Sequence, residues 1–278
     1  QSDVASIAAA DQPAALFMLA ATWPDRIKVI PHEPAYDCQP GHKFITDAGT
    51  GPDGKSSADI PPDTPEASQN IGYGDTRRHQ YWHFIDTPFS PDSTPVEPAY
   101  TPNALTQLLA LSKALRTDEG DDIKSYDMVW VEHLVGDLHQ PLHDTSRFTS
   151  GHPYGDEGGN LVLICETSGC AEELHGHWDD LPGPGNNLPA AITLGEELNK
   201  QPAPDDDAID IENPADWVTQ GFKLAKTVAY APPVFADSAG SSPKKLDSAY
   251  SAKATATMKA QLLLAGYRLA DLLKNYLN

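Results

Sequence analysis

The stretch SYDMVWVEHLVGDLHQPLH, residues 125 to 143, combines a helical pattern with three histidines. Its apolar residues recur at helical spacing: Met128, Val131, Leu134, Val135 and Leu138. This periodicity predicts an amphipathic helix from Ser125 to Gln140. Pro141 cannot continue that helix, because proline lacks a backbone donor and its ring clashes with the preceding turn. His143 is therefore predicted to lie beyond the regular helix.

Helical patterns also occur in four other parts of the chain. Two alanine-rich pieces lie within residues 4–22 and are separated near Pro13, which is tolerated only at a helix start. A helix from Thr101 would have a threonine cap and a proline at its first position. The remaining helices are expected from Asn213 through Tyr230 and from about Asp247 onward.

Few stretches are typical of strands. NLVLIC, residues 160–165, predicts one arm of a short β-hairpin. Residues 31–75 are rich in Pro, Gly, Asp and Ser and predict a long irregular excursion, while DDD at 205–207 predicts a solvated loop. The chain has 278 residues, 40% hydrophobic content and no marked internal linker. We therefore expect a mainly α fold with long irregular loops, as a single domain over residues 1–278.

The composition is acidic, with a formal net charge of −21. A strong nucleic-acid binder normally has a basic surface, so the net charge alone argues against nucleic acid as a substrate. That argument weakens if bound divalent cations make the local charge at the site positive. Cys165 and Cys170 predict a small disulfide loop, with Cys38 left over, and hence a secreted or periplasmic protein. No apolar stretch is long enough to span a bilayer, and no heptad pattern demands an oligomer, so we expect a monomer.

Two pairs of polar residues at helical spacing indicate a metal site. His133 and Asp137 are four residues apart, so they share one face of the predicted helix. LHGHWDD repeats this spacing with His175 and Asp179. Together with His143, these residues resemble a set of metal ligands. Buried polar residues without a metal remain the alternative for each of them.

Asp25 in WPDRIK and His83 in QYWHFIDTP are further candidate ligands, because each is a polar residue among bulky apolar or aromatic neighbours. Either residue alone would more often be structural. Mixed imidazole and carboxylate ligands suit zinc, and clustered divalent metals commonly hydrolyse phosphate esters. The combination predicts metal-assisted cleavage of a phosphoester.

Five motifs, in the order WPDRIK, WHFIDTP, EHLVGDLHQPLH, GDEGGN and LHGHWDD, resemble those of the zinc-dependent single-strand-specific nucleases and 3′-nucleotidases, which are relatives of the bacterial zinc phospholipases C. The resemblance runs from about residue 4 to the C-terminal helices. It implies the mainly helical fold of that group and hydrolysis of single-stranded DNA or RNA and of 3′-nucleotides. A metal-activated water would leave 5′-phosphate ends.

The resemblance also implies metal ligands. One zinc ion is expected on Asp25, His83, His133 and Asp137. A second ion, with open positions for water, is expected on His143, His175 and Asp179. Asp137 would also contact a third zinc ion. Ligands for about two of the three expected ions are therefore identified.

The same resemblance implies residues that meet the substrate. Lys28 stands where the family usually has an arginine near the scissile phosphate, so Lys28 and Asp137 are expected to be catalytic. Lysine supplies the positive charge but cannot form the two parallel hydrogen bonds of arginine. Phe84 would stack on the base, and Asp86 would accept a hydrogen bond from its edge. Asn160 would either help to bind substrate or serve only the glycine-rich turn. The other histidines considered match no ligand position and are expected at the surface or behind the ligands: His79, His139, His152 and His177.

The chain departs from the family in the segment ahead of Asp25. Family members bind the third zinc ion with an N-terminal tryptophan and a histidine a few residues later, whereas this sequence begins QSDVASIAAA. Either the numbered chain is shorter than the mature protein, or the cluster is incomplete. Two other functions remain open at this point: a phospholipase C acting on phospholipid headgroups, and a noncatalytic metal-binding protein of the same fold.

Overall fold

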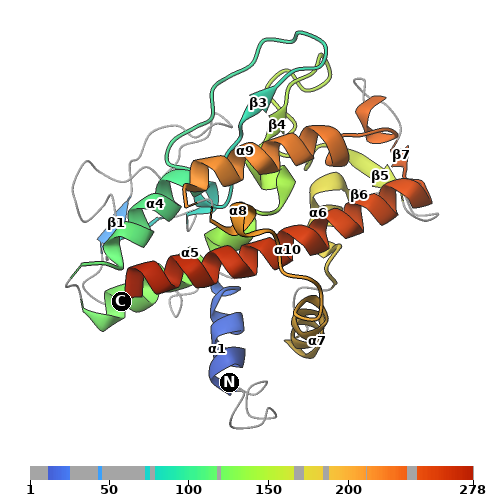
Figure 1. The fold of residues 1–278 in the computed structure, drawn as a ribbon. Coiled ribbons are helices and arrows are strands. Elements are labelled where there is room, and N and C mark those ends of the chain that lie inside the picture. Colours follow the sequence, from blue (N-terminus) through green and yellow to red (C-terminus); the bar gives the residue numbers. More distant parts are fainter. Residues whose placement is uncertain are drawn as a thin grey trace. The chain divides into compact units, whose positions relative to one another are not determined.

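Helices dominate the computed structural model, and its strands are short (Figure 1). The structure describes residues 12–25, 43–45, 73–75, 79–117, 120–165, 172–183, 188–210, 212–236 and 243–277. The prediction of a mainly α fold is confirmed. Within these residues, none of the helices is long and apolar enough to cross a membrane.

The chain forms two compact units, and each is discontinuous in sequence. The first unit comprises residues Gln1–His83, Tyr100–Val135 and Asp271–Asn278. The second comprises residues Phe84–Ala99 and Gly136–Ala270. The expectation of one domain over residues 1–278 stays a prediction.

The first unit is built around buried aromatic side chains. Its elements are α1 (Gln12–Ala20), β1 (Lys43–Ile45), β2 (Tyr73–Asp75), η2 (Gln80–Trp82), α4 (Ala104–Ala114), most of α5 (Asp121–Asp137) and the end of α10 (Ser248–Leu277). β1 and β2 pair in parallel. Trp82 and Trp130 are fully buried, with ring centroids 5.0 Å apart and an edge-on contact, which is a favoured aromatic geometry. Trp130 also contacts the rings of His83 and His133, which are described below.

Two helix boundaries differ from the sequence prediction. α4 begins at Ala104, because Asn103 rather than Thr101 is the cap: its side chain accepts from the backbone N–H of Thr106, whose hydroxyl accepts from the backbone N–H of Asn103. α5 begins at Asp121 and ends at Asp137, whereas residues 125–140 were expected. Between α5 and Pro141 the chain forms two turns, in which the N–H groups of His139 and Gln140 donate to the carbonyls of Gly136 and Asp137. His143 lies beyond the α-helix, as predicted.

The second unit combines short helices and short strands with most of the long helix α10. Its elements are β3 (Pro88–Phe89), η3 (Pro141–Asp144), β4 (Ser146–Arg147), β5 (Leu163–Cys165), β6 (Glu172–Glu173), α6 (Leu174–Asp180), α7 (Leu188–Leu198), α8 (Asp206–Ile209), α9 (Pro214–Leu224), the π-helical turn η4 (Ala225–Ala229), η5 (Val234–Ala236), β7 (Lys244–Lys245) and most of α10. β3 and β4 pair in parallel. β5 pairs antiparallel with β6, as the hairpin prediction required, and in parallel with β7.

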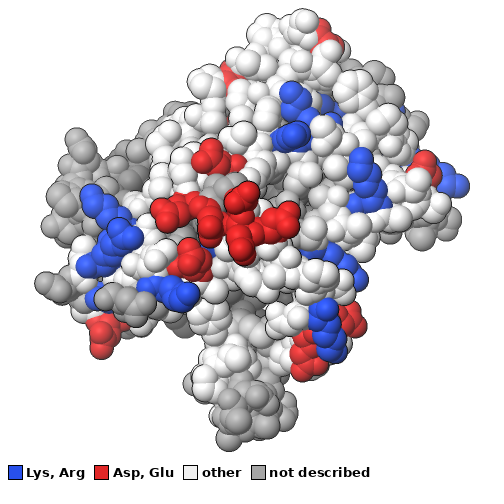
Figure 2. Space-filling model, viewed as in Figure 1, with Lys and Arg blue, Asp and Glu red and all other residues white. Residues whose placement is uncertain are grey.

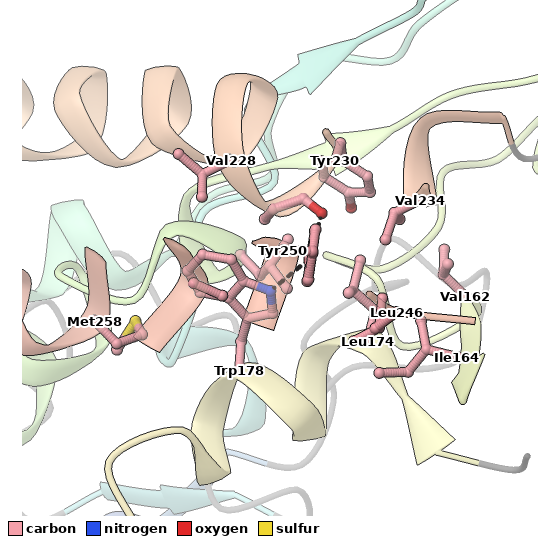
Figure 3. Packing of buried hydrophobic residues seen from close by; sticks show 14 residues of the cluster. Val162, Ile164, Leu174, Trp178, Val228, Tyr230, Val234, Leu246, Tyr250 and Met258 are labelled. Atoms are coloured by element: carbon pink, nitrogen blue, oxygen red, sulfur yellow. Dashed lines mark hydrogen bonds between the residues drawn. The ribbon is translucent and has the colours of Figure 1, made fainter. Parts of the chain in front are cut away.

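Trp178 anchors α6 in the core of the second unit (Figure 3). Its indole Nε1 donates to the hydroxyl of Tyr250 at 3.0 Å, and that hydroxyl donates to the carbonyl of Ala229 at 2.7 Å. Both polar groups are thus satisfied inside an apolar cluster, as burial requires. Because Trp178 lies between His175 and Asp179 in sequence, this anchor fixes the helix that presents both of them.

The prediction of a solvated loop at residues 205–207 is wrong in part, since Asp206 and Asp207 open the short helix α8. Arg268 stabilises this helix, because its guanidinium donates to the carbonyl of Ala208 from Nε at 3.1 Å and from Nη2 at 2.8 Å. Figure 2 shows acidic side chains gathered over α8. The exposed acidic residues there are Asp205, Asp206, Asp207, Asp210, Glu212 and Asp216.

Candidate metal centre

In the first unit, the structure brings together Asp25, His83 and His133. Nδ1 of His83 lies 2.7 Å from Nε2 of His133. Oδ1 of Asp25 lies 3.6 Å from that His83 nitrogen and 3.7 Å from that His133 nitrogen. Both imidazoles are buried, whereas the carboxylate is 57% exposed. Three potential ligand atoms therefore converge at one point, where the carboxylate faces solvent.

A hydrogen bond to Ala21 and ring contacts with Trp130 orient the two imidazoles of this group. Nδ1 of His133 lies 2.7 Å from the carbonyl of Ala21, which can only accept, so Nδ1 carries the proton and Nε2 of the neutral ring keeps its lone pair. The ring of Trp130 meets His83 and His133 edge-on, at centroid distances of 5.3 and 6.2 Å. A histidine that binds a metal usually donates a hydrogen bond from its other nitrogen, as His133 does to the carbonyl of Ala21.

In the second unit, the structure brings together His143, His175 and Asp179. The two Nε2 atoms of the histidines lie 3.2 Å apart. Oδ1 of Asp179 lies 3.5 Å from Nε2 of His143, and Oδ2 lies 3.7 Å from Nε2 of His175. His143 comes from η3, while His175 and Asp179 share one face of α6 as their spacing predicted. We call these three residues the second-unit group.

Two hydrogen bonds orient this group. Nδ1 of His175 donates to the carbonyl of Gly158 at 2.9 Å, which leaves Nε2 without a proton in the neutral ring. The amide nitrogen of Gln140 donates to Oδ1 of Asp179 at 2.9 Å. The orientation of that amide is fixed, because its oxygen accepts from the backbone N–H of Leu142 at 2.6 Å.

The electrostatics of the second-unit group favour the protonation states that bind a cation. Burial lowers the pKa of His175, and the neighbouring His143 lowers it further, so the ring stays neutral. Burial would raise the pKa of Asp179, but hydrogen bonds from His143 and Gln140 lower it overall. A neutral imidazole and an ionised carboxylate are the ligand forms that zinc requires.

Asp137 lies one turn beyond His133 on α5 and belongs to neither three-residue group. Its Oδ1 is 3.9 Å from Nδ1 of His143, which is too long for a hydrogen bond. Its expected roles, as a ligand of the first zinc ion and as a contact of a third, stay predictions. Lys28, the other expected catalytic residue, lies outside the described residues.

The expected substrate residues occupy the second unit. Phe84 and Asp86 are half-buried just after His83 in the sequence. Burial, together with the charges of Asp156 and Glu157, raises the pKa of Asp86 to about 7, while His143 opposes the rise. Asn160 donates from its side chain to the carbonyl of Glu157 at 2.7 Å, so it closes the glycine-rich turn. Its contact with substrate remains a prediction.

Three of the remaining histidines lie in the interior, so the first of the two positions expected for them, at the surface or behind the ligands, is excluded. His79, His139 and His177 are all buried. The ring of His79 stacks on Trp82 with centroids 4.0 Å apart. Nε2 of His139 accepts from Nη1 of Arg268 at 3.0 Å, since a guanidinium can only donate.

Gln140 and Asp156 support the site, although no sequence pattern indicated them. Gln140 caps η3 through its side chain, but glutamine is not among the preferred capping residues, so the sequence carries no signal for it. Asp156 is fully buried in GDEGGN and pairs with the fully buried Arg147. No periodicity connects Arg147 with Asp156, so their pairing follows only from the fold.

The two groups fit zinc better than a hard cation. Each offers two imidazole nitrogens and one carboxylate oxygen, and the ligand atoms of each group lie within 4.8 Å of one another. Imidazole ligands suit zinc and related transition metals, whereas magnesium and calcium prefer all-oxygen sites. Three protein ligands are also the number that catalytic zinc sites use, because the remaining position receives water or substrate.

The family model of the S1/P1 nucleases matches residues 1–278. The chain belongs to the S1/P1 nuclease family. A search of curated proteins finds no match for it. As an S1/P1 nuclease, the protein is a hydrolytic enzyme that acts on nucleic acid, and the family suggests the use of zinc. The order of motifs and the geometry of the two groups agree with this assignment.

Proposed function

We propose that this S1/P1 nuclease is a zinc-dependent endonuclease and 3′-nucleotidase that cleaves single-stranded DNA or RNA and leaves 5′-phosphate ends. The observation that supports this proposal is the pair of His–His–Asp groups, each with three potential ligands and a carboxylate that faces solvent. A site with three protein ligands keeps a position open for water or for a phosphate oxygen.

In this proposal, each residue has a defined task. Bound zinc would polarise the phosphoryl oxygens and make water a nucleophile near neutral pH. His175 and Asp179 hold their ligand atoms in place through hydrogen bonds to Gly158 and Gln140. The site needs no protein nucleophile, because water attacks and the sugar oxygen leaves. Asp137 would contact a third zinc ion.

Substrate recognition would rest on Phe84, Asp86 and Lys28. Phe84 would stack on a base, and Asp86 would hydrogen-bond to the edge of that base. Lys28 would contribute a positive charge to the scissile phosphate, without the bidentate geometry of arginine. Bound cations would offset the acidic side chains that otherwise repel a polyanion.

We further propose that the protein is a secreted or periplasmic monomer, with a disulfide-closed loop between Cys165 and Cys170. Cys165 is buried at the end of β5, whereas Cys170 lies outside the described residues. S1/P1 nucleases are generally secreted, which supports this location. Mass spectrometry under nonreducing conditions tests the pairing, and light scattering tests the oligomeric state.

One substrate panel tests the proposed activity. The full chain is stripped with a chelator, reloaded with zinc, and given a single-stranded oligonucleotide, a matched duplex, a 3′-nucleotide and phosphatidylcholine. We expect cleavage of the single strand and of the 3′-nucleotide, slower cleavage of the duplex, and 5′-phosphate ends. Hydrolysis of phosphatidylcholine alone would indicate a phospholipase C. Stoichiometric zinc with no turnover of any substrate would indicate a noncatalytic metal-binding protein.

A further inference from the structure

The turn of GDEGGN has an unusual backbone. Glu157, Gly158 and Gly159 have φ values of 54°, 59° and 90°, so three consecutive residues lie in the left-handed region. Glycine adopts this region easily, but a residue with a side chain pays about 1–3 kcal/mol for it. Such a turn persists only where its surroundings hold it, so the structure must supply an anchor.

Asp156 supplies that anchor from the interior. Its Oδ1 accepts from the backbone N–H of Arg147 at 2.9 Å, from the hydroxyl of Tyr230 at 3.0 Å and from the N–H of Gly159 at 3.3 Å. Its Oδ2 accepts from Nε of Arg147 at 3.2 Å. Its carbonyl accepts from the N–H groups of Gly159 and Leu161. One residue thus ties the turn to β4 and to the end of the π-helical turn η4.

Stability alone is a poor explanation for this arrangement. Arg147 and Asp156 are both 0% exposed, and the cost of removing two charges from water often exceeds their attraction. Well-packed apolar residues in their place are often as stable or more so. The buried ion pair beside this strained turn is better explained by a positioning role, in which it keeps the backbone of the turn in one fixed place.

The turn meets the ligands of the second-unit group directly. The carbonyl of Gly158 accepts from Nδ1 of His175. Gly158 has no room for a side chain, because a Cβ atom there would collide with the carbonyl of Leu142 and lie 3.2 Å from Nδ1 of His175. Leu142 directly precedes His143, so the turn packs against the backbone of one ligand and fixes the ring of another.

We propose that Asp156 is a positioning residue for the second-unit group, because it holds the Gly158 carbonyl that keeps Nδ1 of His175 protonated and Nε2 free for a cation. The inference concerns the metal site of the proposed function, but it requires only that the group binds zinc. An outer partner of this kind typically changes metal affinity by about 10–100-fold.

The test uses the full chain with Asp156→Asn and Tyr230→Phe. Asp156→Asn removes the charge that pairs with Arg147, whereas Tyr230→Phe removes one donor to Asp156 and keeps the ring. Met258→Ala serves as the control, because Met258 is buried in the core cluster but lies on α10 rather than on the turn. Nitrogen-15 NMR of the zinc-free proteins reports the tautomer of His175, and competition with a chromophoric chelator reports zinc affinity.

We expect a fixed Nδ1-protonated ring for His175 in the wild type and a tautomer mixture in Asp156→Asn, with zinc affinity about tenfold lower or more. Tyr230→Phe should change both readouts in the same direction by a smaller factor, and it carries the test if Asp156→Asn does not fold. Met258→Ala should change neither. An unchanged tautomer and affinity in the folded variants would overturn the proposal. Because neither readout uses cleavage, a failure of the nuclease proposal would remain distinguishable.

Discussion

Replacement of Gln140 by methionine should separate metal binding from stability. Methionine has a similar length but cannot donate to Asp179 or accept from the backbone N–H of Leu142. A hydrogen bond to a charged group contributes about 1.5–3 kcal/mol. At about 1.4 kcal/mol per factor of ten, that range corresponds to a loss of roughly 10–150-fold in zinc affinity. Because the side chain of Asp179 is 48% exposed, solvent screens the bond, and we expect about tenfold.

The same change leaves the buried N–H of Leu142 without its acceptor, which should lower the free energy of unfolding by about 1–3 kcal/mol. Competitive zinc titration measures the affinity, and urea unfolding in chelator measures the stability. Gln220→Met is the matched control, since it removes an acceptor for Nη2 of Arg268 at 2.8 Å and leaves both bonds of Gln140 in place. The reasoning is refuted if Gln140→Met loses stability while zinc binds within twofold of the wild-type affinity.

Three further predictions follow from the second unit. The pKa of Asp86 rises from its ordinary 3.8 to about 7, so between these pH values the folded protein keeps a proton that the unfolded chain has lost. The free energy of unfolding of the metal-free protein should therefore fall as pH rises from 3.8 to about 7. Urea midpoints at pH 5 and pH 8 measure this fall, which should be smaller for Asp86→Asn. Gly221→Ala should lower the free energy of unfolding by about 1–3 kcal/mol, because the new Cβ would overlap the fully buried carboxyl of Asp144. In a urea titration, a double variant with Asp144→Ala should recover part of this loss. Strictly additive effects of the two substitutions would count against the overlap. Zinc at 100 times its dissociation constant should stabilise the folded protein by about 2.7 kcal/mol, measured as a rise in the urea midpoint that His175→Ala reduces.

The helical skeleton could be read from the sequence wherever apolar periodicity and caps agree. The helix through His133, the break at Pro141 and the cap at Asn213 are all local features, and the structure confirms them. The start of α4 was misplaced because Thr101 and Asn103 are both acceptable caps, and only the reciprocal bond with Thr106 distinguishes them. Local signals of similar strength cannot decide between such neighbours.

The candidate site was partly predictable for a different reason. Helical spacing placed His175 and Asp179 on one face, and the motif resemblance supplied the residues that join them from elsewhere in the chain. The supports were not predictable, because the bonds of Gln140 to Asp179 and of Asp156 to Arg147 depend on tertiary packing. The burial of His139 likewise depends on Arg268, which lies 129 residues away in the sequence.

Zinc content measured together with cleavage tests the central claim most directly. Elemental analysis of the full chain gives the number of ions, and a single-stranded DNA assay with and without chelator gives their function. The account predicts at least one zinc ion for each His–His–Asp group, and cleavage that chelator abolishes and zinc restores. Equal cleavage by the zinc-free protein, or loss of both groups' histidines without loss of zinc, would contradict it.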